Sequence, residues 1–308
     1  MTIAPSYVIR FCAASALLVL VPIGVCNADQ TSSTLATTTT ATVRKTTNTI
    51  VGPARRDVPG TTASVGMGEL YIPGFYDAAN STGTDIVVFF HGAAWCARQN
   101  FYDARKNAVL VSVSGGNYEN TFRDPAAFAG ILDETTRTLK RLGISEKPLG
   151  QICLASFSGG YSAVREILRQ PQFARNITCV VLADSLYGPK SKSDPIRLDA
   201  EAIAPFLTFA RRAASGETFF IFSHLHPPDP RHRSNTTEIA AATLIEAIGA
   251  ERRDDHGRNS AGAEILYRAD KGNFHVLGYS GMSNQDHFNH FYGLCDLLRE
   301  TPLPPAGR

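Results

Sequence analysis

Uninterrupted apolar runs of strand length alternate with helical patterns along most of the chain. The runs that indicate strands cover residues 85–90, 108–113, 151–155, 177–182 and 218–223. Continuous apolar runs of this length are typical of strands that are buried on both faces of a parallel sheet. The helical patterns between them place a helix after each of several strands. We therefore predict an α/β fold with a mostly parallel central sheet and helices on both faces.

The predicted helices begin and end at residues with recognisable capping chemistry. Asp124 and Pro125 fit an N-cap and a first-turn proline, and the apolar positions that follow have mostly helical spacing up to Gly143. Further helices are expected at 161–168, 200–214 and 237–248. A final strand region covers 264–267 and 274–279, followed by a loop that ends at His287. The long connection from Tyr187 to Glu217 has room for a small cap that would set specificity.

The N-terminal fifth of the chain differs in pattern from the rest and sets the domain boundaries. Residues 1–28 have a charged start, an apolar run too short to span a bilayer comfortably, and small residues, Cys26 and Ala28, at the two positions that a cleavage site after Ala28 requires. These features predict a signal peptide, so we expect a secreted or periplasmic protein without a stable membrane span. A lipid anchor at Cys26 is the alternative. Residues 29–64, which are rich in threonine, predict a flexible spacer, and residues 65–308 predict a single folded α/β domain.

Composition and charge narrow the possible partners. The 308 residues are 44% hydrophobic and carry a formal net charge of +2, which suits one large core and argues against a nucleic-acid surface. No metal, nucleotide or flavin motif is present, so no cofactor is expected. Cys153 and Cys179 lie in apolar strand-like runs, where buried free thiols are expected. The oligomeric state is not indicated by the sequence.

The segment from Ser156 to Gly160 joins an apolar strand to a helix and contains a central serine. In a nucleophile elbow the turn is so sharp that the residues two before and two after the nucleophile must be small. Centring the elbow on Ser158 places Ser156 and Gly160 at those positions, whereas centring it on Ser156 would place Leu154 there. Ser158 is therefore the candidate nucleophile, with a serine where the motif usually has its first glycine.

Several segments together resemble the α/β-hydrolase fold family, and in particular exported bacterial hydrolases of that fold. The resemblance covers about residues 86–298 and rests on His91–Ala93 (HGA), Ser156–Tyr161 (SFSGGY), Asp184–Gly188 (DSLYG) and Asp286–His290 (DHFNH). It implies a serine, an acid and a histidine, in that chain order, at the carboxyl ends of the strands. A serine hydroxyl needs such a histidine as base and an acid to orient the imidazole.

The eight histidines include one at the expected place for the base. His287 lies in the segment after the last predicted strand, and His290 is the alternative one helical turn further on. His275 lies inside the strand and is expected to be structural, while His224 and His226 follow the preceding strand and are expected to line the cleft. His287 is therefore the predicted base.

Two aspartates compete for the role of the acid. Asp184 ends the strand that follows the elbow helix, and Asp229 follows the next strand, which is the usual position of the acid in this fold. The proline-rich surroundings of Asp229 are typical of a surface turn, so Asp184 is favoured. Asp286 adjoins the histidine and is expected to point away from it.

The developing oxyanion needs preorganised backbone donors. By position these are the N–H groups of Gly159, after the nucleophile, and of Ala93, in the turn after the strand 85–90. The resemblance thus implies hydrolysis of a small-molecule or polymeric ester by an acyl-enzyme route. The alternatives are an amidase or peptidase of the same fold, and a binding protein on a hydrolase scaffold without catalysis.

Overall fold

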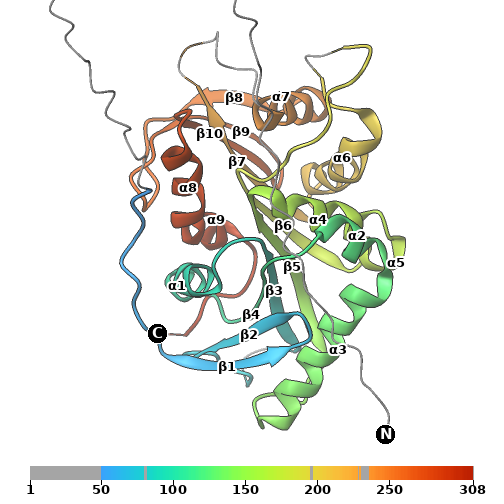
Figure 1. The fold of residues 1–308 in the computed structure, drawn as a ribbon, viewed down its shortest axis with the longest axis vertical. Helices are drawn as coiled ribbons and strands as arrows, with labels where there is room; N and C mark the ends of the chain where they lie inside the picture. The colour runs from blue at the N-terminus through green and yellow to red at the C-terminus, as the bar shows by residue number, and fades with distance from the viewer. Residues whose placement is uncertain (1–49, 80–81, 195–196, 228, 230–235, 308) are drawn as a thin grey trace, which may run out of the picture. The chain divides into compact units, whose positions relative to one another are not determined.

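The strands of the molecule form one sheet (Figure 1). We analysed a computed structural model, which describes residues 50–79, 82–194, 197–227, 229 and 236–307. Within these residues the strand order is β1-β2-β4-β3-β5-β6-β7-β10-β9-β8. Their bounds are β1 Gly60–Val65, β2 Gly68–Pro73, β3 Thr84–Phe90, β4 Val109–Val113, β5 Leu149–Phe157, β6 Ile177–Ala183, β7 Phe219–His226, β8 Glu251–Asp254, β9 Ile265–Lys271 and β10 Phe274–Ser280.

The middle of the sheet is parallel and its two edges are antiparallel. From β4 through β3, β5, β6 and β7 to β10, every neighbouring pair runs parallel. The edge strands β1 and β2 on one side, and β9 and β8 on the other, pair antiparallel. The continuous apolar runs of the sequence form the central strands, as predicted, because helices cover both faces of these strands and bury their side chains. The predicted fold class, a mostly parallel α/β sheet with the architecture of the α/β-hydrolase fold, is confirmed.

Helices cover both faces of this sheet. Their bounds are α1 Ala94–Ala104, α2 Tyr118–Arg123, α3 Pro125–Arg141, α4 Tyr161–Leu168, α5 Pro171–Ala174, α6 Ala200–Ala214, α7 Thr236–Ile248, α8 Asn284–Tyr292 and α9 Leu294–Glu300, with a 3₁₀ turn, η1, at Ser158–Gly160. Alternate residues of β3 enter two different cores. Val88 packs in the core under α3, α4, α6 and α7, whereas Phe89 packs in the core under α1, α8 and α9.

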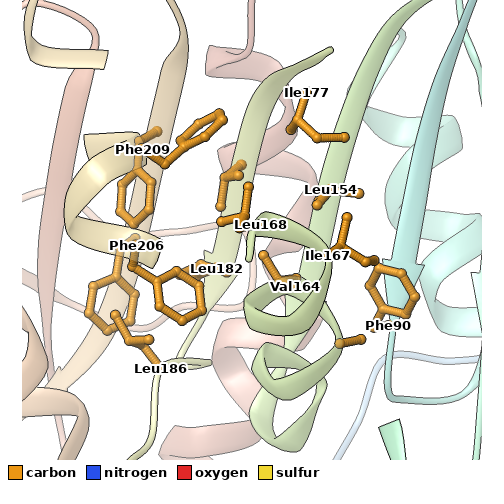
Figure 2. Packing of buried hydrophobic residues seen from close by; sticks show 14 of the residues in the cluster. Phe90, Leu154, Val164, Ile167, Leu168, Ile177, Leu182, Leu186, Phe206 and Phe209 are labelled. Atoms are coloured by element: carbon orange, nitrogen blue, oxygen red, sulfur yellow. The ribbon is translucent and has the colours of Figure 1, made fainter. Parts of the chain in front are cut away.

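The connection between β6 and β7 corrects one expectation from the sequence. Its helix lies at 200–214 as predicted, but α6 belongs to the main body of the fold and does not form a cap. Phe206 and Phe209 of α6 are buried in the core beside α4 and β6, where Figure 2 shows Phe206 close to Leu182 and Leu186. The apolar face of α6 is therefore committed to covering the sheet.

Residues before the predicted domain start also belong to the folded body. The boundary expected at residue 65 falls at the end of β1, and the Val51 amide donates a hydrogen bond to the Gln285 side chain at 2.6 Å. Arg56 forms an ion pair with Asp103. The sequence missed β1 because its strand is mostly exposed and carries few apolar residues. The predicted signal peptide, and the predicted spacer up to residue 49, lie outside the described residues.

The four cysteines of the described part of the chain form no disulfides there. Cys96, Cys153, Cys179 and Cys295 are buried there as free thiols. None of the helices in that part is both long enough and apolar enough to cross a membrane.

Candidate active site

The strand-to-helix turn after β5 has the strained geometry of an elbow. Ser158 has φ of 49°, a left-handed conformation that costs free energy for any residue other than glycine. A Cβ added to Gly160 would lie 2.8 Å from the Phe90 carbonyl carbon and 3.0 Å from the Ser156 Cβ. The turn thus leaves no room for a side chain at Gly160. This is the steric demand from which the sequence analysis chose Ser158.

The serine at the first small position of the elbow takes part in a short hydrogen-bond chain. The Ser156 and Ser185 hydroxyls lie 2.7 Å apart, and the Ser185 hydroxyl donates to the Ser158 carbonyl oxygen at 2.8 Å. Ser156 is therefore the donor in the first contact. Both hydroxyls are fully buried. Ser156 replaces the usual glycine at this position and, through Ser185, ties the strained turn to the segment after β6.

The predicted base and the favoured acid are in direct contact. His287 Nδ1 lies 2.6 Å from Asp184 Oδ2, although the two residues are 103 positions apart in the chain. With Nδ1–H donated to the carboxylate, the neutral imidazole keeps Nε2 as its proton acceptor. This contact favours Asp184 over Asp229 as the partner of His287.

Asp184 is held as a buried carboxylate. Its own φ is 41°, and its side chain has no exposure to solvent. Burial by itself would raise the pKa of this carboxyl, but the His287 hydrogen bond, the nearby histidines and the Leu225 amide, which donates to Oδ1 at 3.2 Å, together lower the pKa below its ordinary value. The carboxylate is therefore ionised at neutral pH despite its burial.

His287 lies on a helix, which corrects the expectation that it ends a loop. Helix α8 begins at Asn284, and Ser283 with Asp286 forms a capping box at its N-terminus. Asp286 therefore points away from His287, as expected, and accepts hydrogen bonds from the Met282 and Ser283 amides. The Ser-x-x-Asp pattern at 283–286 is the signal in the sequence from which this helix start could have been predicted.

The aromatic ring of the residue before Ser158 packs against the imidazole of His287. Phe157 immediately precedes Ser158, and its ring stacks on the His287 ring with centroids 4.5 Å apart. Among the described residues the structure records no hydrogen bond between the Ser158 hydroxyl and His287, and contacts of this kind commonly tighten only when substrate binds. Ser158 and Asp184 thus directly follow the carboxyl ends of the neighbouring strands β5 and β6, and His287 contacts both Asp184 and the residue that precedes Ser158.

The two backbone amides that the sequence predicts as oxyanion donors belong to residues at the starts of helical segments. Ala93 is the N-cap of α1, and Gly159 lies in η1, so both amides are at helix starts, where N–H groups lack intrahelical acceptors. His91 has φ of 71° and Gly92 of 119°, and a Cβ on Gly92 would lie 2.8 Å from the Phe291 ring. The positive φ values at His91 and Gly92, and the close packing of Gly92 on Phe291, therefore define the turn between β3 and the N-cap of α1 at Ala93.

Four of the other histidines, all considered from the sequence above, contact buried or paired polar groups. His290, the alternative base, is buried on the same helix, with its Nδ1 2.8 Å from the Ser223 hydroxyl. His275 bonds Asp270 at 2.6 Å, as befits a structural residue. His224 and His226 were expected to line the cleft, but they are buried between β7 and α7. That expectation was wrong because both side chains face the core under α7.

The buried His290 is expected to make the protein less stable in mild acid. Burial lowers its pKa from 6.5 to about 4, so between these values the unfolded chain binds a proton that the folded protein does not. The free energy of unfolding should therefore fall as the pH drops from 6.5 toward 4, by up to about 1.4 kcal/mol per pH unit from this residue. Urea unfolding at several pH values with a chelator present, for the wild type and His290→Asn, measures this. Equal slopes for the two proteins would contradict the prediction.

Comparisons with known proteins were made by sequence and by structure. No family model matches the chain, and no curated protein matches its sequence. Among solved structures, a feruloyl esterase module from Clostridium thermocellum is 14% identical over 80% of this chain and 87% of its own, with a TM-score of 0.39. An IroE-like serine hydrolase from Shewanella oneidensis is 13% identical over 75% of this chain and 74% of its own, with a TM-score of 0.37.

A third similar structure is a thermostable esterase from Pseudomonas putida. It is 13% identical over 80% of this chain and 82% of its own, with a TM-score of 0.36. At such low identities and TM-scores these similarities by themselves assign neither a family nor an activity to the chain. The fold class rests on the sheet topology, and the site on its own geometry.

Proposed function

We propose that this protein is an exported serine hydrolase that cleaves a carboxylic ester through an acyl-enzyme intermediate. The observation that carries the proposal is the hydrogen bond of 2.6 Å between His287 and the buried Asp184, beside a serine with a φ of 49°. Of the four residues other than glycine with positive φ in the described chain, His91, Ser158 and Asp184 belong to this site. Strain concentrated in this way is typical of functional sites.

The proposed reaction follows from the positions of the proton donors and acceptors. His287 Nε2 takes the Ser158 hydroxyl proton as the oxygen attacks the ester carbonyl carbon, and Asp184 stabilises the imidazolium that forms. The Gly159 and Ala93 amides donate to the oxyanion. Collapse of this intermediate expels the alcohol, which takes the proton from His287. A water molecule, deprotonated by the same imidazole, then releases the acid and restores Ser158.

Labelling with a fluorophosphonate probe tests the proposal. The purified protein should be labelled stoichiometrically, and Ser158→Ala should abolish labelling because the hydroxyl is the atom that the probe modifies. Ser162→Ala is the matched control, since Ser162 lies on the adjoining helix and its hydroxyl donates a hydrogen bond to the Gly159 carbonyl oxygen at 3.0 Å. Folded wild type that is not labelled would refute the proposal, as would equal labelling of Ser158→Ala.

The kind of bond cleaved needs a second measurement. Rates with a short-chain nitrophenyl ester and with the matching anilide, measured for the wild type and Ser158→Ala, separate esterase from amidase activity. We expect turnover of the ester without comparable turnover of the amide. Comparable turnover of both would replace the esterase by an amidase or peptidase of the same fold.

A further inference from the structure

Three buried side chains with metal-binding atoms converge between β7 and α7, apart from the proposed catalytic groups. His224 and His226 are alternate residues of β7, so both project from the same face of the strand. Glu238, near the start of α7, faces them. Its Oε2 lies 2.7 Å from His226 Nδ1 and 3.4 Å from His224 Nδ1. All three side chains are buried.

We propose that His224, His226 and Glu238 bind a divalent transition-metal ion, with Zn²⁺ as the best match, at a buried structural site. This site goes beyond the hydrolase function and departs from the expectation that the chain has no metal. Two imidazoles and one carboxylate form a donor set that zinc uses in proteins, whereas Mg²⁺ and Ca²⁺ prefer oxygen ligands alone.

The spacing of the donor atoms suits such an ion. Tetrahedral ligands at zinc distances are about 3.3 Å apart, and the His224 Nδ1 to Glu238 Oε2 distance is 3.4 Å. The 2.7 Å contact of His226 with Glu238 is a hydrogen bond, which an ion would replace after a side-chain shift of less than 1 Å. The donors thus need little rearrangement to bind the metal.

Neighbouring groups complete the surroundings of the ion. The Tyr267 hydroxyl oxygen lies 2.6 Å from His224 Nε2, so it can accept a hydrogen bond from Nε2–H when the imidazole proton moves from Nδ1 to Nε2 and Nδ1 binds the metal. The Leu225 carbonyl oxygen, 2.8 Å from His224 Nδ1, loses a hydrogen bond in that exchange and becomes available as a further oxygen ligand. The exchange therefore leaves both nitrogens of His224 with partners.

The position of the cluster gives the ion a structural role. Leu225 lies between the two histidines, and its amide donates to Asp184 Oδ1 at 3.2 Å. An ion held by His224 and His226 would fix the backbone on both sides of that donor. The metal would thus stabilise the segment that holds the buried carboxylate, without contacting the substrate.

Metal binding to the full chain, expressed without a polyhistidine tag and stripped with EDTA, tests the proposal. Titration calorimetry with ZnCl₂ should show one tight site, and Co²⁺ should produce visible absorption bands. His226→Gln and Glu238→Gln should each weaken Zn²⁺ binding by about tenfold or more. His275→Gln, which removes a comparable histidine from the pair between His275 on β10 and Asp270 on β9, should bind Zn²⁺ as the wild type does.

Several outcomes would overturn the proposal. Stripped wild type that binds no Zn²⁺ would show that His226 and Glu238 form only a hydrogen-bonded pair, and unchanged affinity in both variants would place the ion elsewhere. If the variants do not fold, thermal unfolding of the wild type decides, because an ion bound only by the folded state must raise Tm as its concentration rises. Unchanged Tm would overturn the proposal. Ser158→Ala should bind Zn²⁺ normally, so this test is independent of catalysis.

Discussion

Replacing Asp184 with asparagine is expected to lower kcat/KM for ester hydrolysis by about 10⁴-fold, the size of the loss when the acid of a comparable triad is made neutral. The carboxylate accepts the Nδ1–H of His287 at 2.6 Å and is fully buried. An amide at that position can hold the imidazole in the wrong tautomer and carries no charge to balance an imidazolium. Steady-state kinetics with a nitrophenyl ester measures the loss, and near-UV circular dichroism checks the fold.

Two neighbouring carboxyls provide controls for the Asp184 variant. Asp286→Asn changes the residue next to His287, whose carboxylate caps α8, so it should cost about 1 kcal/mol of stability and little activity. Asp229→Asn should leave kcat/KM near the wild-type value. A large loss from Asp229→Asn, with activity retained by Asp184→Asn, would assign the acid to Asp229 instead.

Much of the fold was predictable because its central strands are buried on both faces. Burial on two faces requires continuous apolar runs, which identify strands such as β3 and β6 without knowledge of their partners. The edge strands β1 and β8 are mostly exposed, so the same physics imposes no such pattern on them. Tertiary pairing alone makes these segments strands, and they could not be recognised from local sequence.

The candidate site was predictable where a local steric rule applied. The elbow allows only small residues two positions before and two positions after the nucleophile, and that rule selected Ser158 before any partner was known. Asp184 was favoured over Asp229 only because the surroundings of Asp229 are typical of a surface turn, and the contact with His287, 103 positions away in the chain, now supports that choice directly. The prediction for His224 and His226 was wrong: they were expected to line the cleft, but side chains at the end of a strand can face either a cleft or a core. Only the position of α7 shows that they face Glu238.

The elbow itself can be tested through two adjacent glycines with opposite surroundings. Gly160→Ala is expected to destabilise the protein by about 3 kcal/mol or more, or to prevent folding, because the new Cβ would collide with the Phe90 backbone and the Ser156 Cβ. Gly159→Ala is the matched control, since a Cβ there would have no atom within 4 Å. It should retain most of the wild-type free energy of unfolding.

Urea unfolding of the three proteins, followed by circular dichroism, measures this difference. The comparison isolates the tight approach of α4 to β3 and β5 from the general effect of adding a methyl group in a turn. A Gly160→Ala protein as stable as Gly159→Ala would mean that the bend can open without cost. The strain at Ser158 would then not be imposed by the packing of the elbow, and the steric argument that selected this serine would fail.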